Sequence, residues 1–240
     1  MLSITDHDST EGLVATRLLQ VAHPEMRVIP GIEMSAEGDI YCHLLGYFVD
    51  VNSSAFQEQL GRLRQKRLER IAAMVKKMNA LGFAIDYARV VALASGGSVG
   101  RPHLADALVE KGVVKSRQEA FDRFLKRDGP AYVPSEGLTA AKAIALIRAA
   151  GGVPVLAHPS YYTSPEFLKP MVDLGLAGLE VFYPDHSRSL VQRYLELAAS
   201  YRLIVTGGSD FHGPGTHRSA LACVDVPEYV VDALVQAAQV

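Results

Sequence analysis

The sequence predicts an α/β fold: a parallel sheet or barrel of alternating strands and helices, interrupted by an all-helical insertion. Short apolar runs alternate with helical patterns in residues 1–50 and again in residues 131–240. Between them, residues 51–130 are charged and helical in pattern, with no strand signal. Such alternation is typical of β/α repeats, in which helices cover a largely parallel sheet.

Hydrophobic periodicity and turn residues predict the helices and strands of the first half of the chain. Outside the insertion it contains a predicted helix at 10–22 and predicted strands at 28–35 and 40–49, with a turn at Gly38 and Asp39. The predicted helices of the insertion cover 57–82, 86–94, 100–112 and 116–129. Glycine or turn residues follow each of these four helices, as expected at helix ends.

The second half resumes the alternation of helix and strand. Its predicted helices cover 138–150, 165–174, 187–200 and 227–238, and its predicted strands cover 153–160, 178–184 and 202–212. No internal repeat or low-complexity tract is present. We therefore expect one barrel domain, formed by 1–50 and 131–240, and one helical subdomain at 51–130.

Composition restricts the class of protein. A chain of 240 residues, 49% hydrophobic and 21% charged, is long enough to bury a large core. The net charge of -2 provides no general attraction to nucleic acid or anionic membranes, so any polyanion must bind a local patch. Cys42 and Cys223 lie outside any CxxC, which favours a reducing cytoplasm over a disulfide scaffold. We expect no membrane contact and no obligate protein partner.

Histidines and carboxylates gather at the ends of the predicted strands. The carboxyl ends of strands in such folds face one cavity, where functional groups cluster. The candidates are His7, Glu33 and His158, each ending one strand, Asp210 and His212, ending the last strand, and His43 within a strand. Imidazole and carboxylate ligands without thiolate suit Zn, Mn or Fe sites that are open to substrate.

A structural interpretation competes with this one. An isolated histidine at a strand end is more often a hydrogen-bonded loop residue than a metal ligand. However, four strand ends carry such residues, and D-x-H at 210–212 places two of them on the same side of an extended chain, which packing alone explains poorly. We interpret His23 as structural and Cys42 as core filling, and both interpretations stay open for His217.

Six motifs in order resemble those of the PHP (polymerase and histidinol phosphatase) superfamily. They are SITDHDSTEGL, PGIEMS, HLLGYFVD, VLAHPS, LEVFYPDHS and GGSDFHGP. The resemblance covers essentially the whole chain, including the helical insertion with its GRPH. It is to the branch of phosphoesterases that acts on nucleoside 3′,5′-bisphosphates and short RNA ends.

The resemblance implies a distorted seven-stranded β/α barrel, TIM-like, that binds two or three divalent metal ions, Mn, Fe or Zn. The implied ligands are His7, Glu33, His43, His158, Asp210 and His212, with Glu33 bridging two metals. For Asp6, two roles stay open, orienting an imidazole from behind or capping the following turn. A metal-activated water would be the nucleophile, so we expect no further catalytic residue.

The sequence departs from the family pattern at its start. The family opens with a strand that carries H-x-H and then an acid before glycine, and this sequence contains no H-x-H. We therefore expect an N-terminally truncated chain whose first barrel strand is missing. Activity of the chain as written is uncertain on this ground, because part of the expected metal cluster has no counterpart.

Substrate recognition is expected from the insertion. We interpret Arg101 and His103 as a second phosphate site, because proline near a helix start leaves backbone N–H groups open and Arg101 offers a bidentate fork. Alternatively, Arg101 pairs with an acid such as Asp106. His186 lies at the rim near substrate or starts a helix beside Ser187.

Other basic and aromatic residues have two interpretations each. Arg67 and Arg70 either follow an RNA backbone or form a solvated face. The pair at 161–162 either stacks on a base or packs. The predicted substrate is a phosphorylated nucleotide or short RNA. The alternatives are a histidinol-phosphate phosphatase, a polymerase-associated module, or a metal-binding domain without turnover.

Overall fold

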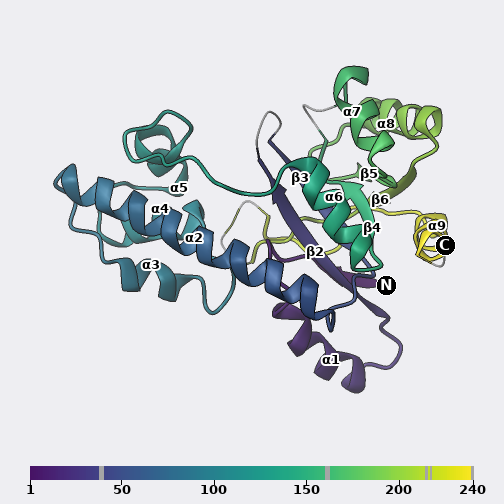
Figure 1. Cartoon of the computed structure of the whole chain (residues 1–240), viewed down its shortest axis with the longest axis horizontal. Helices are drawn as coiled ribbons and strands as arrows, with labels where there is room; N and C mark the ends of the chain where they lie inside the picture. Colours follow the sequence, from purple (N-terminus) through teal and green to yellow (C-terminus); the bar gives the residue numbers. More distant parts are fainter. Residues whose placement is uncertain (38–40, 160–162, 214–215, 217, 239–240) are drawn as a thin grey trace. The chain divides into compact units, whose positions relative to one another are not determined.

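The computed structural model describes residues 1–37, 41–159, 163–213, 216 and 218–238 (Figure 1). The chain divides into two compact units, which we call the sheet unit, residues 1–56 and 138–240, and the helical unit, residues 57–137. The sequence placed the two boundaries after residues 50 and 130. The expected turn residues Gly38 and Asp39, the tyrosines at 161–162 and His217 lie outside the described residues.

A six-stranded sheet forms the centre of the sheet unit. Its strands are Leu2–Ile4 (β1), Val28–Ala36 (β2), Cys42–Tyr47 (β3), Val153–Leu156 (β4), Gly178–Phe182 (β5) and Ile204–Gly207 (β6). They lie in the order β1-β2-β3-β4-β5-β6. The inner stretches are nearly continuous in apolar residues, with β4 buried along its whole length, as expected for a sheet covered on both faces.

The strand directions correct the expectation of a parallel sheet. The pairs β1–β2, β4–β5 and β5–β6 are parallel, but β2–β3 and β3–β4 are antiparallel. Strands β2 and β3 follow each other with a short connection, and adjacent parallel strands require a crossover of a dozen or more residues. The order of the strands along the chain therefore makes β2 and β3 a hairpin.

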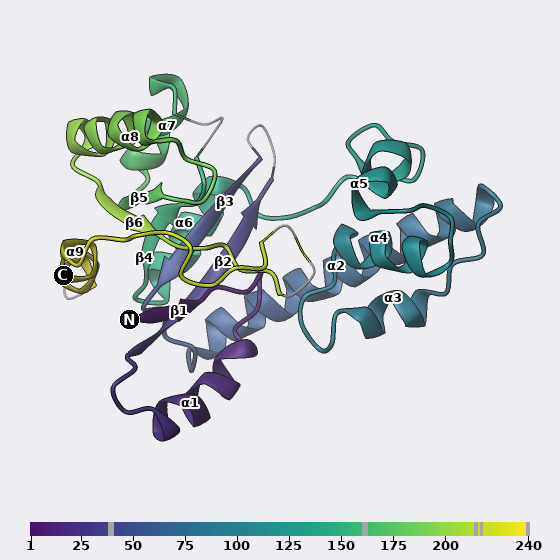
Figure 2. The ribbon, with the colours of Figure 1, turned by 180° about the vertical axis from the view of Figure 1, so that it is seen from behind.

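Helices follow most strands of the sheet unit, and Figures 1 and 2 show them around the sheet. They are Gly12–Ala22 (α1), Ala140–Ala149 (α6), Pro165–Asp173 (α7), Arg188–Tyr201 (α8) and Tyr229–Ala237 (α9). Helix α6 packs against β2, β3 and β4, and α8 packs against β5 and β6. Thr139 and Ser187 cap α6 and α8 by accepting backbone N–H groups of the first turn, which explains where these helices begin.

The helical unit contains only helices among its ordered elements. They are Ser54–Ala80 (α2), which starts in the sheet unit, Tyr87–Leu93 (α3), Arg101–Glu110 (α4), Arg117–Ala120 (α5) and the π-helical turn Phe121–Leu125. Met74, Met78, Leu104 and Leu108 are fully buried in its core. Apolar residues of α2 and α4 thus meet in a core of their own, and charged residues cover the outside.

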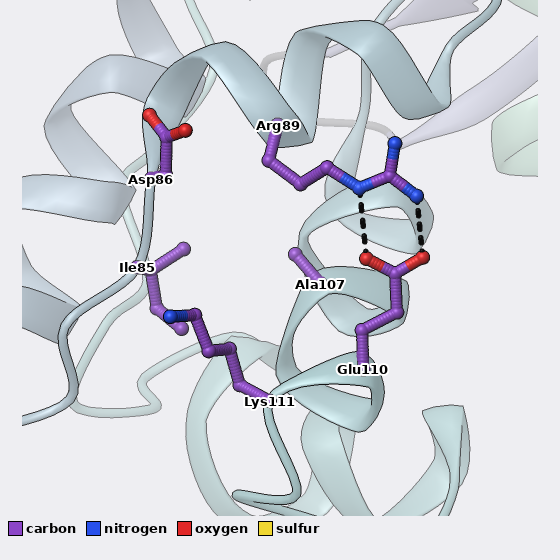
Figure 3. Close-up of a pocket in the computed structure, with 6 residues that line it drawn as sticks. All are labelled: Ile85, Asp86, Arg89, Ala107, Glu110 and Lys111. Carbon is purple, nitrogen blue, oxygen red and sulfur yellow. Dashed lines mark hydrogen bonds and ion pairs between the residues drawn. The ribbon is translucent and has the colours of Figure 1, made fainter.

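A small surface pocket of about 260 Å³ lies beside α3 and α4 in the helical unit (Figure 3). Arg89 donates to both carboxylate oxygens of Glu110, at 2.9 and 2.7 Å, and the side chain of Lys111 extends away from this pair toward Ile85 (Figure 3). Both partners of this ion pair are about half exposed. The pair therefore contributes little to stability.

The described strands form an open series, because β1 pairs only with β2 and β6 only with β5. The expected seventh strand and the closed barrel stay predictions. No helix in the described ranges combines the length and the apolar character needed to cross a membrane.

Candidate metal centre

Four of the predicted ligands converge in the sheet unit, around the carboxylate of Glu33. One oxygen of Glu33 lies 2.7 Å from Nδ1 of His43 and 3.1 Å from Nε2 of His158. Its other oxygen lies 3.7 Å from Nε2 of His7. These residues come from positions 7 to 158 of the chain, so the fold, rather than local sequence, brings them together.

The histidine rings also contact one another. Nδ1 of His43 lies 3.1 Å from Nε2 of His158, and the rings of His7 and His43 meet edge to face with centroids 4.8 Å apart. One ligand atom each from His7, Glu33 and His43 fits within 4.8 Å. Several imidazole nitrogens and a carboxylate oxygen at this spacing suit a divalent cation such as Zn, Mn or Fe.

Glu33 stays ionised in this cluster. Burial by itself raises the pKa of the Glu33 carboxyl, which is 5% exposed, but the nearby His7, His158 and His43 together hold its pKa well below the usual value. Burial lowers the pKa of His158, but the hydrogen bond and charge of Glu33 outweigh it and raise that pKa. A buried carboxylate that stays negative is suited to bind a cation.

The elements that carry these four residues differ in part from the expectation. His43 lies within β3, as predicted, but His158 lies beyond the end of β4 at Leu156, because the predicted strand 153–160 was too long. Glu33 was expected at the end of its strand, but β2 continues to Ala36, and Glu33 pairs with Leu45 of β3. The sequence did indicate this, because the hydrophobic pattern continues past Glu33 and the predicted strand ran from 28 to 35. His7 lies beyond β1, at an isolated bridge to Glu33.

Asp210 and His212 lie on the segment after β6. The strand ends at Gly207, so the expected strand 202–212 was too long at both ends. Asp210 has a φ of +50°, in the left-handed region, so the D-x-H stretch is not extended, and the argument from an extended chain was wrong. Nδ1 of His212 donates to the carbonyl oxygen of Asp210 at 2.7 Å. The ring of His212 lies 6.4 Å from that of His7, at the edge of the cluster.

Strained backbone marks this edge of the sheet. Asp8, His158 and Asp210 all have positive φ, at +49°, +27° and +50°. Such conformations cost of the order of 1–3 kcal/mol each for residues other than glycine, and they cluster at functional sites. Asp8 is buried, and its carboxylate accepts the backbone N–H of Ser35 at 3.1 Å, which ties the segment after β1 to β2.

The structure shows two site residues that the sequence interpretation missed. Glu180 of β5 is 5% exposed, and its carboxylate accepts the backbone N–H of His158 at 2.7 Å. Burial raises the pKa of Glu180 to about 8, although that N–H lowers it. Tyr183 donates its hydroxyl to Asp210 at 2.8 Å. An acid within the apolar run LEVF was a signal for Glu180, because buried acids in strands are rare.

Asp6 and His186 both lie near the starts of helices, Asp6 near the start of α1 and His186 just before Ser187, the cap of α8. The Asp6 carboxylate accepts the backbone N–H of Gly12, at the start of α1, which is the capping alternative. Nδ1 of His186 donates to the carbonyl oxygen of Val181 at 2.8 Å, and its ring lies between those of Tyr183 and Tyr194. Burial lowers the pKa of His186, so its ring is kept neutral.

Cys42 is buried and directly precedes His43 in the sequence. Burial raises the pKa of its thiol to about 12, so no thiolate forms near neutral pH. Cys42 therefore lacks the properties of a nucleophile, in agreement with its interpretation as core filling.

Arg101 and His103 lie at the start of α4, within the helical unit. Arg101 donates to the carbonyl oxygen of Leu125 at 3.3 Å, and its guanidinium lies 5.9 Å from the centre of the Tyr132 ring. Asp106, the alternative partner of Arg101, instead forms a bidentate pair with Arg117.

His103 caps its own helix. Nδ1 of His103 accepts the backbone N–H of Gly100 at 3.0 Å, and burial lowers the pKa of the ring. Arg70 lies 5.7 Å from the centre of the Tyr132 ring and donates to the carbonyl oxygen of Val133 at 2.9 Å. Two arginines therefore lie near one tyrosine in this unit.

Comparison with characterised proteins identifies relatives over most of the chain. It is 32% identical to phosphoribosyl 1,2-cyclic phosphate 1,2-diphosphodiesterase of Eggerthella lenta, covering 88% of this chain and 82% of that protein. It is 31% identical to the 5′-3′ exoribonuclease Rnm of Salmonella typhimurium, covering 89% and 75%. It is also 31% identical to 3′,5′-nucleoside bisphosphate phosphatase of Chromobacterium violaceum, covering 90% and 78%. No family model matches the chain.

Two solved structures share the fold. A protein from Bifidobacterium adolescentis, described as a metal-dependent phosphoesterase, superimposes with a TM-score of 0.87 at 31% identity, covering 98% of this chain and 85% of that one. An amidohydrolase from Chromobacterium violaceum, solved with sulfate, superimposes with a TM-score of 0.86 at 28% identity, covering 98% and 86%. By name, the three characterised relatives hydrolyse phosphoester bonds, and the chain shares the fold of the two solved structures over 98% of its length.

Proposed function

The chain belongs to the PHP superfamily of metal-dependent phosphoesterases, and from this premise we propose that it hydrolyses the 5′ phosphoester of nucleoside 3′,5′-bisphosphates or of short RNA 5′ ends. The observation that carries the proposal is the convergence of His7, His43 and His158 on the ionised carboxylate of Glu33. Two of the relatives, by name, act on such substrates or on RNA.

We propose that His7, Glu33, His43, His158, Asp210 and His212 hold two or three divalent ions, Mn, Fe or Zn. When bound, such ions lower the pKa of a water molecule and neutralise charge on the phosphoryl group. The residues of the chain position that chemistry: Glu33 supplies the central negative charge, and the imidazoles surround it. Because Cys42 is protonated, a water molecule rather than the thiol is the proposed nucleophile.

A second phosphate is proposed to bind in the helical unit, at Arg101. Asp106 is paired with Arg117 and not with Arg101, whose guanidinium lies 5.9 Å from the centre of the Tyr132 ring. A guanidinium oriented by aromatic contact is suited to bidentate phosphate binding. We propose that His103 supports this site by capping α4 rather than by touching substrate, since its Nδ1 is engaged by Gly100.

We propose that the sheet unit is a seven-stranded barrel whose further strand pairs with the open edge of β1. This strand has three residues, and Leu2 is 39% exposed, as is expected of a strand that lacks a neighbour. Helix α1 beside it exposes Val14 and Val21 at 70% and 82%. A further strand bearing H-x-H would cover this edge. A reading frame upstream of the Met1 codon that encodes H-x-H and then an acid before glycine would support the proposal.

The main experiment measures bound metal and phosphate release together. The purified protein, reconstituted with Mn²⁺, Fe²⁺ or Zn²⁺, is expected to release phosphate from adenosine 3′,5′-bisphosphate. Parallel assays use a short 5′-phosphorylated RNA, histidinol phosphate and phosphoribosyl 1,2-cyclic phosphate, the last named after the Eggerthella lenta relative. Glu33→Gln is expected to lose metal and activity together. Turnover of histidinol phosphate alone would overturn the substrate assignment.

Bound metal without turnover of any of these substrates would favour the alternative of a metal-binding domain. That outcome decides against the enzyme only if a chain extended by a strand bearing H-x-H is inactive as well.

The second experiment tests the phosphate site with Arg101→Ala. We expect a rise in KM for adenosine 3′,5′-bisphosphate of about 10-fold or more, since charge-assisted bonds contribute about 1.5–3 kcal/mol. KM for a nucleoside monophosphate should change much less. Arg89→Ala is the matched control, because Arg89 also forms a bidentate contact within the helical unit. Equal effects of Arg101→Ala on both substrates would refute the assignment.

A further inference from the structure

Arg218, on the segment after β6, is a buried guanidinium that no motif of the sequence singled out. Its side chain is 10% exposed, although the partner side chain of Asp185 is 66% exposed. It donates to both oxygens of the Asp185 carboxylate, one of them at 3.0 Å. A second donor goes to the hydroxyl of Tyr183 at 3.0 Å, and the guanidinium lies 4.8 Å from the centre of that ring.

The same arginine reaches the carboxylate of Asp210. Its Nε lies 3.5 Å from Oδ2 of Asp210, the oxygen that also accepts the Tyr183 hydroxyl at 2.8 Å. The other oxygen, Oδ1, lies 3.5 Å from Nδ1 of His212. The two oxygens of Asp210 therefore have different neighbours: Oδ2 faces Arg218 and Tyr183, and Oδ1 lies on the His212 side.

The backbone of Asp210 makes such support necessary. With a φ of +50°, this residue adopts a conformation that is costly for a residue other than glycine. The side chain of an aspartate has few rotatable bonds, so fixing one oxygen fixes the other. Arg218 also anchors the backbone, because its carbonyl oxygen accepts the N–H of His212 at 2.8 Å.

The charges around Arg218 fit a supporting role. The guanidinium lies between two carboxylates, those of Asp185 and Asp210, and its bidentate contact is with Asp185. The guanidinium therefore forms its close pair with Asp185, whereas it reaches Asp210 only at 3.5 Å. If Asp210 were the sole carboxylate neighbour of Arg218, the guanidinium would form its close pair with Asp210 and compete with a metal ion for that carboxylate.

We propose that Arg218 is a positioning residue of the metal centre: together with Tyr183 it holds Oδ2 of Asp210, so that Oδ1 is presented to a divalent cation. This inference rests on the proposed role of Asp210 as a ligand. Groups that orient metal ligands from behind typically change metal affinity or activity by about 10–100-fold when they are removed.

The test is isothermal titration of the metal-free protein with Mn²⁺, together with phosphate release from adenosine 3′,5′-bisphosphate. Arg218→Ala is expected to weaken Mn²⁺ binding by about 10-fold or more and to lower kcat, with KM for the nucleotide within about twofold of the wild type. Arg218→Lys should recover only part of the affinity, because lysine cannot make the bidentate contact with Asp185. Tyr183→Phe should weaken binding as well.

Two further variants separate positioning from folding. Asp185→Ala removes the anchor of Arg218 without touching Asp210 and should weaken Mn²⁺ binding by less than Arg218→Ala does. Arg89→Ala removes a bidentate ion pair within the helical unit and should leave Mn²⁺ affinity unchanged. Circular dichroism and the thermal midpoint report folding of every variant. If Arg218→Ala does not fold, Arg218→Lys and Tyr183→Phe decide the question in its place.

The outcomes distinguish the two proposals. A wild type that binds Mn²⁺ and releases phosphate supports the proposed function, and wild-type affinity and kcat in folded Arg218 variants would then overturn the role of Arg218 alone. A wild type that binds metal without turnover still tests Arg218 through the Mn²⁺ titration. A wild type that binds no divalent metal would overturn both proposals.

Discussion

Replacing Glu180 by alanine takes away the acceptor of the His158 backbone N–H. The hydrogen bond is 2.7 Å long, and it supports a residue whose φ is +27°. Both groups lie at the inner side of the cluster, with Glu180 only 5% exposed. We therefore expect alanine at this position to act on stability and on the geometry of His158 together.

The magnitude follows from the contact that is lost. A buried N–H without an acceptor costs about 1–3 kcal/mol of unfolding free energy. The cavity left by the shortened side chain adds to that cost. Glutamine at the same position keeps an oxygen acceptor and nearly the same volume, so we expect Glu180→Gln to lose about 1 kcal/mol or less.

The ionisation of Glu180 makes the glutamine variant informative. Burial raises its pKa from 4.5 to about 8, partly opposed by His158 and reinforced by the charges of Glu33 and Asp210. Between pH 4.5 and about 8, the carboxyl of Glu180 therefore keeps its proton in the folded state and loses it in the unfolded state. Glu180 therefore contributes stability that is present below about pH 4.5 and is lost as pH rises toward 8. Glu180→Gln should remove this contribution to the pH dependence of the unfolding free energy.

The assay is urea unfolding of the metal-free protein from pH 5 to pH 8, followed by circular dichroism. The wild type is expected to lose stability relative to Glu180→Gln over this range, by up to about 1.4 kcal/mol per pH unit. Glu180→Ala should be less stable than Glu180→Gln at every pH. Equal stability of the two variants, or parallel curves for wild type and Glu180→Gln, would refute the reasoning.

Three further predictions concern the rest of the chain. Burial lowers the pKa of His103, so its contribution to stability should be complete above its unfolded pKa of about 6.5 and lost as pH falls below it; His103→Gln should flatten the urea-unfolding curve between pH 7 and pH 5. Leu104→Ala, at a fully buried site of the helical unit, should cost about 2–5 kcal/mol in the same assay, and a cost below 1 would contradict the packing described. Ser187→Ala removes the cap of α8 and should lower the unfolding free energy by about 1 kcal/mol, with Ser200→Ala, at the other end of the same helix, as the control.

Periodicity and turn residues predicted most elements to within a few residues. The helix predicted at 57–82 is α2, Ser54–Ala80, and the strand predicted at 178–184 is β5, Gly178–Phe182. These succeed because local hydrophobic patterns and glycine stops act over short distances. The antiparallel pairing of β2 and β3 follows from the short connection between them, which the expectation of a parallel sheet did not take into account.

The site was predicted as a set of residues, but not in its geometry. His7, Glu33, His43 and His158 meet as the strand-end argument requires, although Glu33 lies inside β2. The conformation of Asp210 and the arrangement of Glu180 behind His158 arise from long-range contacts. Such contacts join residues 22 or more positions apart, so no window of the sequence reveals them.

All six proposed ligands belong to the sheet unit, and residues 57–137 supply none of them. Under the proposed function, bond cleavage is encoded in the flanking segments of the gene and recognition of the second phosphate in the middle one. Exchange of the middle stretch between relatives can thus change what is cleaved and leave the ion-binding groups as they are. Diversification within the superfamily needs no new chemistry if it proceeds by this route.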